Sequence, residues 1–433
     1  MKYFATLGLF FLILFMIDTP TFSDIDLIAD GAIIINAETG QVLYSKNEHT
    51  PLFPASTTKI LTALIILEDM NLRDTIVVDP ESPYAGGSHI ALEPGEEVTV
   101  EQLLYSLMIA SANDAAEVLA RKHSGSIEAF AEVMNARAAE LGALNSNFAN
   151  PHGLHNKDHI STAYDLAIIA RYAMKNDTFR TIVKAKRYEI PPTNKKTETR
   201  YLNSTNSLYQ GMAGSTQLID VGGERVPVAY EFADGIKRGY TPEAQFCFVG
   251  SATKDGRQFI TAVLKSQSTA MYEDTRKMMD YAFTGTTKHL IAKSGDPAKT
   301  LTLSNKKQTS VTSIYAESVS IDLPNDYKIE DIEFKELISS HIELPLKKGE
   351  VIGTKEFYLN DALLHQVTLV SDDNYIGEDL LNDITQFFST EKKSWSLFLV
   401  KILLAILLWR TIMTMHRINK IKRRHYQKKT RLG

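Results

Sequence analysis

The chain has 433 residues, of which 44% are apolar and 23% charged, and this composition predicts folded domains with a buried core. Its net charge of −5 is unevenly spread, because nine basic residues from Arg410 onward have no acidic neighbour and leave −14 for the rest. An acidic body with a basic tail argues against nucleic acid as the main partner and favours a tail at the inner face of a membrane. The single cysteine, Cys247, excludes an internal disulfide, and its apolar neighbours predict a buried thiol.

The N-terminus carries the first apolar segment. A charged start at Lys2, an apolar run and small residues near Ser23 are typical of a secretory signal peptide over residues 1–23. An uncleaved membrane anchor is the alternative, and the short apolar run disfavours it. The body of the protein is therefore expected to be exported.

The next elements alternate between strands and helices. Residues 31–48 contain two β-rich runs around a turn and predict a hairpin. The run 60–67 is apolar on nearly all sides, which is typical of a helix buried all round. Further helices are expected over residues 99–110, 126–141 and 161–175.

A second strand pair follows these helices. Residues 244–266 predict a hairpin that turns near Asp255, and a helix is expected near residues 272–283. Strand pairs separated by helices indicate an α+β fold, with an antiparallel sheet flanked by helices. The segment 210–230 is interpreted as an extra hairpin, and it is expected to lie beside the candidate site described below.

The C-terminal third has a different pattern. Short alternating strands predict a small β-sandwich, followed by a polar linker and an apolar segment long enough to span a bilayer. Lys401 and Arg410 interrupt that segment on opposite helix faces, which favours a spanning helix over a surface-lying one. The predicted organisation is a signal peptide (1–23), a catalytic domain (24–287), a β-sandwich (288–371), a linker (372–393), a transmembrane anchor (394–415) and a basic cytoplasmic tail (416–433).

A serine hydroxyl needs a base to act as a nucleophile, and a lysine three residues later on a helix lies on the same face. The pattern Ser-x-x-Lys occurs four times, so it is weak by itself. Only Ser56, paired with Lys59, follows Pro-Ala and opens the buried helix, whose N-terminus favours a developing oxyanion. The serines at 251, 304 and 389 lie at a hairpin, in the β region and in the linker.

Two further patterns complete a candidate site. Among three Ser-x-Asn patterns, Ser111 with Asn113 falls at a junction between helices, although helix capping alone also explains it. The best literal Lys-Ser/Thr-Gly match starts at Lys293, but Asp-Pro follows at once and forbids a central strand. The segment Lys237–Gly239 instead introduces a hairpin, and its glycine permits close approach of a substrate backbone.

The strings PASTTK, SAND, NPHGLHNKDHISTAYDLA and DGIKRGYT occur in the order found in the D-alanyl-D-alanine carboxypeptidases, the low-molecular-mass penicillin-binding proteins. The chain resembles this family from about Asp24 to Ser371. The resemblance implies a penicillin-binding/β-lactamase-like catalytic domain with a helical subdomain. It further implies peptidoglycan stem peptides as substrates, β-lactams as inhibitors, and no metal or organic cofactor.

The resemblance also implies a role for each site residue. Ser56 would be the nucleophile and Lys59 its base. Ser111 would protonate the leaving amine, and Asn113 would orient the peptide. Lys237 would supply positive charge near Ser111 and near the substrate carboxylate. The backbone N–H groups of Ser56 and Tyr240 would form the oxyanion hole. Arg238, Gly239 and Thr241 would contact the substrate.

Arg238 departs from the family pattern, because a hydroxyl residue normally binds the carboxylate at this position. A guanidinium either replaces that bond with a charge-assisted one or crowds the cleft. A non-catalytic wall-binding or regulatory protein with a disabled third motif is therefore the alternative function. A class A β-lactamase is a weaker one, because its glutamate pattern occurs only at Glu378, in the linker. His152 and His159 are interpreted as structural.

Overall fold

The computed structural model describes residues 25–208, 217–303, 309–340, 342–376 and 400–415. The predicted signal peptide, most of the linker, the start of the predicted anchor and the basic tail lie outside these residues. The described chain divides into two compact units. The first contains residues up to 293 together with 318–336 and 355–367, and the second contains 294–317, 337–354 and the residues from 368 onward.

The centre of the first unit is an antiparallel sheet. Among the described residues it has five strands, in the spatial order β2 (Val42–Lys46), β1 (Gly31–Asn36), β11 (Arg257–Ser266), β10 (Gln245–Lys254) and β9 (Ala233–Thr241). The predicted hairpins are β1–β2 and β10–β11, and both are confirmed. Strand β9 lies at the edge, so its outer backbone groups have no neighbouring strand in the described part of the chain.

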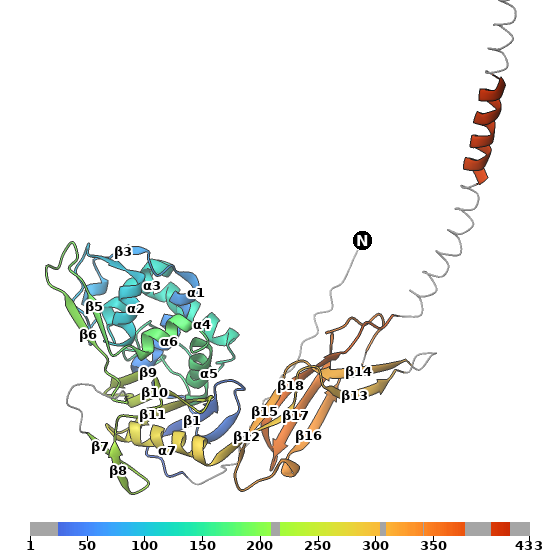
Figure 1. Ribbon diagram of the computed structural model, residues 1–433. Helices are drawn as coiled ribbons and strands as arrows, with labels where there is room; N and C mark the ends of the chain where they lie inside the picture. Colours follow the sequence, from blue (N-terminus) through green and yellow to red (C-terminus); the bar gives the residue numbers. More distant parts are fainter. Residues whose placement is uncertain (1–24, 209–216, 304–308, 341, 377–399, 416–433) are drawn as a thin grey trace, which may run out of the picture. The chain divides into compact units, whose positions relative to one another are not determined.

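Helices cover both faces of this sheet. Figure 1 shows α7 on one face and a group of helices on the other. Their bounds are α1 (Lys59–Asp69), α2 (Val100–Met108), α3 (Asn113–Ser124), α4 (Ile127–Glu140), α5 (Ala163–Ala173), α6 (Asp177–Lys184) and α7 (Ala270–Thr284). The helix α6 was not predicted from the sequence.

The sheet separates two hydrophobic cores, because successive side chains of a strand point to opposite faces. Ile33 and Ile35 of β1 pack with the helices α1 to α6, whereas Ile34 between them packs with α7. The predicted all-round apolar helix is α1, whose residues 59–66 are all buried. The predicted capping box is also present: Thr99 Oγ1 accepts from the Gln102 backbone N–H, and the Gln102 side chain accepts in return.

Short β-ribbons surround the first unit. They are β3 (Thr75–Val77) with β4 (Glu97–Thr99), β5 (Arg187–Ile190) with β6 (Arg200–Asn203), β7 (Leu218–Val221) with β8 (Glu224–Pro227), and β12 (Thr286–Ala292) with β15 (Val319–Pro324). The pair β7–β8 is the predicted extra hairpin. It does not lie on the face of the sheet that carries α1, because Ile219 and Val228 pack in the core of α7.

The C-terminal part is rich in strands, as predicted. The remaining strands are β13 (Pro297–Thr302), β14 (Ser310–Tyr315), β16 (Glu333–Ile338), β17 (Val351–Leu359) and β18 (Ala362–Ser371). In the second unit, β14 pairs with β13 and with the end of β18, and a small core forms around Val311, Leu346 and Ile352. The fold is therefore mixed, with antiparallel sheets and a C-terminal β region.

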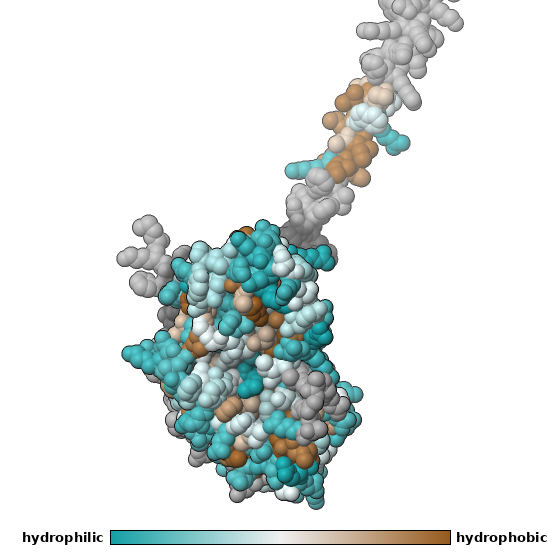
Figure 2. Space-filling view, turned by 90° about the vertical axis from the view of Figure 1, so that its left-hand side faces the viewer, coloured by the Kyte–Doolittle hydropathy of each residue, from teal (hydrophilic) through white to brown (hydrophobic). Residues whose placement is uncertain are grey.

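Residues 400–415 form a separate helix with many exposed apolar side chains, seen in Figure 2 as a brown band. Within the residues that the structure describes, no helix combines the length and apolar character needed to cross a bilayer.

Candidate active site

Ser56 lies in a tight turn at the start of the buried helix. The 3-10 turn η1 (Ala55–Thr58) runs directly into α1, and Ser56 is half-buried. Ala55 has a φ of +47°, in the left-handed region that non-glycine residues rarely adopt. Gly153 packs against this turn so closely that a Cβ there would lie 1.8 Å from the Ala55 carbonyl oxygen. The turn that presents Ser56 therefore requires glycine at position 153.

The Lys59 amine sits at the centre of a polar cluster. Its Nζ donates to Asn113 Oδ1 and to the His152 carbonyl oxygen, both at 2.7 Å, and lies 3.1 Å from Ser56 Oγ. The side chain is fully buried. These contacts bring together groups from α1, from the start of α3 and from the loop before α5.

Burial holds the pKa of Lys59 well below its usual value, and the charge of Lys237 lowers it further. A neutral amine has two N–H donors and one lone pair. In the neutral form, Asn113 Oδ1 and the His152 carbonyl would accept the two N–H bonds, and the lone pair would face Ser56 Oγ at 3.1 Å. This arrangement allows Lys59 to take the proton of the serine hydroxyl.

Asn113 opens α3 and is itself fixed in place. Its Nδ2 donates to the Gly86 carbonyl at 2.7 Å, and its backbone N–H donates to Ser88. Ser111 lies two residues earlier, in the connection from α2, with a φ of +61°. The residue is largely buried, but its hydroxyl, which makes no hydrogen bond with the residues that the structure describes, is not among the buried unpartnered atoms. Asn113 therefore contacts Lys59 through a hydrogen bond, whereas Ser111 is connected to this cluster only by the two residues of backbone that lead to Asn113.

The edge strand β9 approaches Ser56 through Gly239. A Cβ at this position would lie 2.8 Å from the Ser56 backbone nitrogen, so the strand approaches the Ser56 turn this closely only because residue 239 is glycine. Lys237 lies on the same face of the strand and is almost fully buried. Burial and the neighbouring Arg238 lower its pKa to about 7. A buried lysine with no carboxylate partner among the described residues is typical of a functional site.

Arg238 points to the other face of β9. It pairs in register with Phe248, which packs in the core of α7, whereas Lys237 pairs with Val249 on the face of α1. Arg238 is half-buried as a residue, and its side chain makes no ion pair with the described residues. Thr241 returns to the face of Lys237, and its Oγ1 accepts from the Ala244 N–H at 3.0 Å, which leaves its own proton available.

Tyr240 is the last of the predicted site residues. It is half-exposed, and its ring packs against Phe246 at 4.6 Å between centroids. Its backbone N–H follows Gly239 directly, on the segment that contacts the Ser56 turn. The other Lys-Ser-Gly match, at Lys293, follows the end of β12 and precedes β13, so it lies in a turn.

Sequence reasoning missed two features that hold the candidate site, Asp114 and the backbone carbonyl of His152, whereas His159 was already interpreted as structural. Asp114 is fully buried beside Asn113 and accepts from the backbone N–H groups of Ile90 and Leu92, and its pKa is raised by burial. The carbonyl of His152 contacts Lys59, and no sequence pattern marks a backbone acceptor. The His159 ring lies 2.8 Å from Thr58 Oγ1, and burial lowers its pKa to about 3, in agreement with a structural role.

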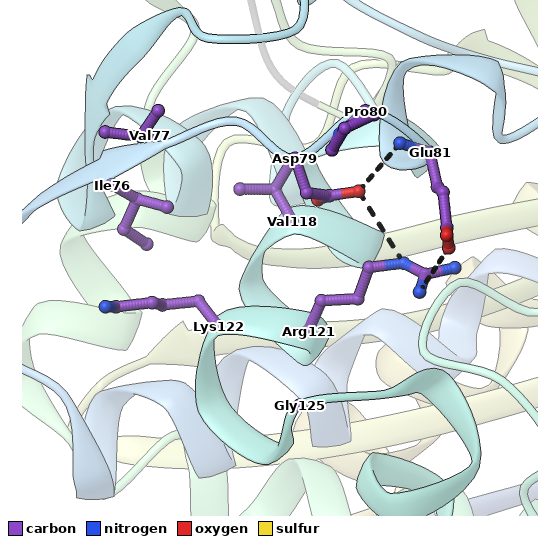
Figure 3. A pocket seen from close by; sticks show the side chains of 9 residues that line it. All are labelled: Ile76, Val77, Asp79, Pro80, Glu81, Val118, Arg121, Lys122 and Gly125. Carbon is purple, nitrogen blue, oxygen red and sulfur yellow. Dashed lines mark hydrogen bonds and ion pairs between the residues drawn. The ribbon is translucent and has the colours of Figure 1, made fainter.

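A cavity of about 300 Å³ lies elsewhere, between β3 and α3. Figure 3 shows that Asp79, Glu81 and Arg121 line it together with apolar side chains. None of the predicted site residues lines this cavity. The residues described contain no group of three or more His, Cys, Asp or Glu side chains suited to a metal ion.

Comparison with known proteins identifies the family of this chain. A family model described as D-alanyl-D-alanine carboxypeptidase, peptidase S11, matches residues 18–268, which is more than half of the chain. The chain belongs to this family. It is a serine-type D-alanyl-D-alanine carboxypeptidase by membership, and a second model, the C-terminal domain of penicillin-binding protein 5, matches residues 286–375.

Named relatives of this carboxypeptidase come from several bacteria. D-alanyl-D-alanine carboxypeptidase DacF of Bacillus subtilis is 34% identical over 75% of this chain and 80% of its own length. A D-alanyl-D-alanine carboxypeptidase of Streptomyces sp. K15 is 36% identical over 59% of this chain and 87% of its own. Penicillin-binding protein 5 from Haemophilus influenzae has the same fold, with a TM-score of 0.66 at 21% identity over 82% of this chain and 99% of that structure.

Proposed function

We propose that this protein removes the terminal D-alanine from peptidoglycan stem peptides through an acyl-enzyme on Ser56. The observation that carries the proposal is the buried Lys59 amine, which lies 3.1 Å from Ser56 Oγ and is held by two carbonyl acceptors. Family membership supplies the substrate class.

The chemistry proceeds in two steps. In the first, Lys59 accepts the Ser56 hydroxyl proton, Oγ bonds to the carbonyl carbon between the two D-alanines, and the C–N bond breaks. The backbone N–H groups of Ser56 and Tyr240 stabilise the oxyanion. The proton taken up by Lys59 is returned through Ser111, which donates its own hydroxyl proton to the departing amine nitrogen and receives the one from Lys59, and free D-alanine leaves. In the second step, water attacks the ester carbon, and Ser56 recovers its proton.

Recognition of the terminal carboxylate is assigned to β9. Lys237 and Thr241 lie on the face of β9 that carries Ser56, and they are assigned to the carboxylate. The side chain of Arg238 starts from the opposite face, so its contact with the carboxylate requires the long side chain to fold around the open edge of the strand. Arg238 is suited to this because its guanidinium has no ion-pair partner among the described residues. Asn113 and the edge of β9 orient the peptide backbone.

We extend the proposal to the location of the enzyme. A signal peptide (1–23) directs export, residues 24–287 catalyse the reaction, residues 288–371 form a β-sandwich, and residues 394–415 anchor the protein so that the basic tail is cytoplasmic. The exposed apolar side chains of residues 400–415 support the anchor. Carbonate extraction of cell membranes tests it: the full chain should stay in the membrane, and a chain ending at residue 393 should be released.

The activity is tested by mass spectrometry after incubation with benzylpenicillin, because β-lactams resemble the dipeptide. The wild-type protein should gain the mass of the opened penicillin on Ser56, and Ser56→Ala should gain none. Release of D-alanine from a peptide ending in D-Ala-D-Ala should depend on the same serine. A wild-type protein that neither acquires the adduct nor releases D-alanine would support the non-catalytic alternative.

A further inference from the structure

The helix α3 carries a second polar group toward the Lys59 cluster, one turn after Asn113. Residues four apart lie on the same face of a helix, and Glu117 is four residues after Asn113. Its Oε1 lies 3.3 Å from His152 Nε2. The His152 carbonyl is one of the two acceptors that hold Lys59. Helix α3 therefore supplies one acceptor of the Lys59 amine, Asn113, and contacts through Glu117 the ring of His152, whose carbonyl is the other acceptor.

The hydrogen bonds define which nitrogen of His152 is protonated. The Leu154 backbone N–H donates to His152 Nδ1 at 3.2 Å, so Nδ1 is an acceptor. The ring proton is then on Nε2 and is donated to Glu117. Burial lowers the pKa of His152, which is consistent with a neutral ring. The imidazole bridges α3 and its own backbone loop.

Further hydrogen bonds hold the backbone on both sides of His152. Thr62 Oγ1 donates to the Pro151 carbonyl at 2.6 Å, and Asn150 Oδ1 accepts from the Gly153 N–H at 2.7 Å. These contacts fix the two ends of the turn, and the bond from His152 to Glu117 fixes its side-chain face. The direction of the His152 carbonyl depends on all of them.

We propose that Glu117 is a positioning residue for acylation. Glu117 accepts a hydrogen bond from His152 Nε2–H, and this bond keeps the His152 carbonyl oxygen in contact with the Lys59 amine. The amine is thereby oriented so that its lone pair points at Ser56. This inference rests on the proposed function, because it assigns Glu117 to the orientation of the base. Glu117 touches neither Ser56 nor Lys59, and its effect passes through His152.

A competing role for Glu117 is its ion pair with Arg121. The two groups are 3.9 Å apart, at the limit of an ion pair. Arg121 has a closer partner in Glu81, at 2.6 Å, and Figure 3 shows both at the separate cavity. Glu81→Ala therefore removes the main partner of Arg121 without touching His152, and it serves as the matched control.

The test uses the purified full chain and a fluorescent penicillin, with the binding constant and the acylation rate constant measured separately. In Glu117→Leu the acylation rate should fall about tenfold to a hundredfold, the loss typical of a reacting group displaced by up to an ångström. The binding constant should be nearly unchanged. Glu117→Gln keeps an oxygen acceptor for the His152 proton and should restore the rate, and Glu81→Ala should acylate as wild type does.

Each other outcome refutes the inference. Equal rates in Glu117→Leu and wild type would show that the contact with His152 does not matter for acylation. Equal losses in Glu117→Leu and Glu117→Gln would show that the charge, and not the acceptor, is needed. Equal losses in Glu117→Leu and Glu81→Ala would assign the effect to Arg121. Thermal unfolding of each variant, together with Glu117→Ala as a second truncation, separates these results from a loss of folded protein. A wild-type chain that penicillin does not acylate would refute the proposed function itself.

Discussion

Gly239→Ala is expected to damage catalysis more than folding. The added methyl group would lie 2.8 Å from the Ser56 backbone nitrogen and 3.0 Å from Ala55 Cβ. Ordinary contact begins at 3.4 Å, so β9 and the Ser56 turn must separate by about 0.6 Å. Backbone atoms on both sides cannot rotate away as a side chain would. The shift moves Lys237 and the Tyr240 N–H away from the nucleophile together.

The size of the effect follows from how steeply reactivity depends on position. A displacement near 1 Å costs about a hundredfold, so about 0.6 Å should reduce acylation about tenfold, or about 1.4 kcal/mol of transition-state stabilisation. Overpacking should lower the free energy of unfolding by about 1–3 kcal/mol. Penicillin acylation rates and urea unfolding measure the two effects separately.

Gly250→Ala provides the matched control for this experiment. Its Cβ would meet Phe248 Cε1 at 2.7 Å and Thr261 Oγ1 at 3.0 Å, so it is equally crowded but contacts side chains away from Ser56. It should lose stability and keep its acylation rate. If Gly239→Ala acylates as fast as wild type, or if both variants lose acylation equally, the close approach of β9 to Ser56 does not control catalysis.

Three further predictions concern the charged groups. Lys59→Ala should lower the acylation rate about 10²–10⁴-fold, the usual contribution of a general base, and labelling at wild-type speed would exclude Lys59 as the base. Arg238→Thr should lower kcat/KM on a D-Ala-D-Ala peptide about tenfold or more, as expected for a lost charge-assisted hydrogen bond, and an unchanged value would exclude contact with the carboxylate. The pKa of Lys237 is about 7 in the folded chain and 10.5 ordinarily, so the unfolded chain binds more protons between these two pH values. Burying Lys237 therefore lowers the free energy of unfolding by its full amount below pH 7, and this loss of stability declines as the pH rises towards 10.5. Lys237→Met should therefore gain stability at pH 6 and lose that gain towards pH 10 in urea unfolding, and a gain independent of pH would contradict the assignment.

The local elements of the catalytic part were predictable because their signals are local. The all-round apolar run of α1 and the capping box of Thr99 identify helices without any knowledge of their neighbours. The short helix α6 was missed because it is only eight residues long and mostly polar outside Phe179, Ile182 and Val183. The extra hairpin was predicted, but its attachment to α7 depends on tertiary packing, which the segment itself does not encode.

The candidate site was predictable only where side chains, and not backbone groups, form it. Ser56, Lys59 and Asn113 could be found by pattern and context. The His152 carbonyl could not, because a backbone acceptor 93 residues from Lys59 leaves no residue-type signal. The left-handed Ala55 also gave none, since alanine rarely adopts that conformation. The side of the strand that Arg238 occupies follows from the alternation along β9, but only once the register with Phe248 is known.

The two faces of the edge strand β9 have different surroundings, so neighbouring positions of the strand accept different substitutions. The Ser56 turn leaves no room for a side chain at position 239, so a larger residue there is expected to displace Ser56. Position 238 faces away from that turn, and its side chain can be exchanged without repacking it. Two neighbouring positions of one strand therefore differ sharply in the substitutions that the surrounding structure accepts.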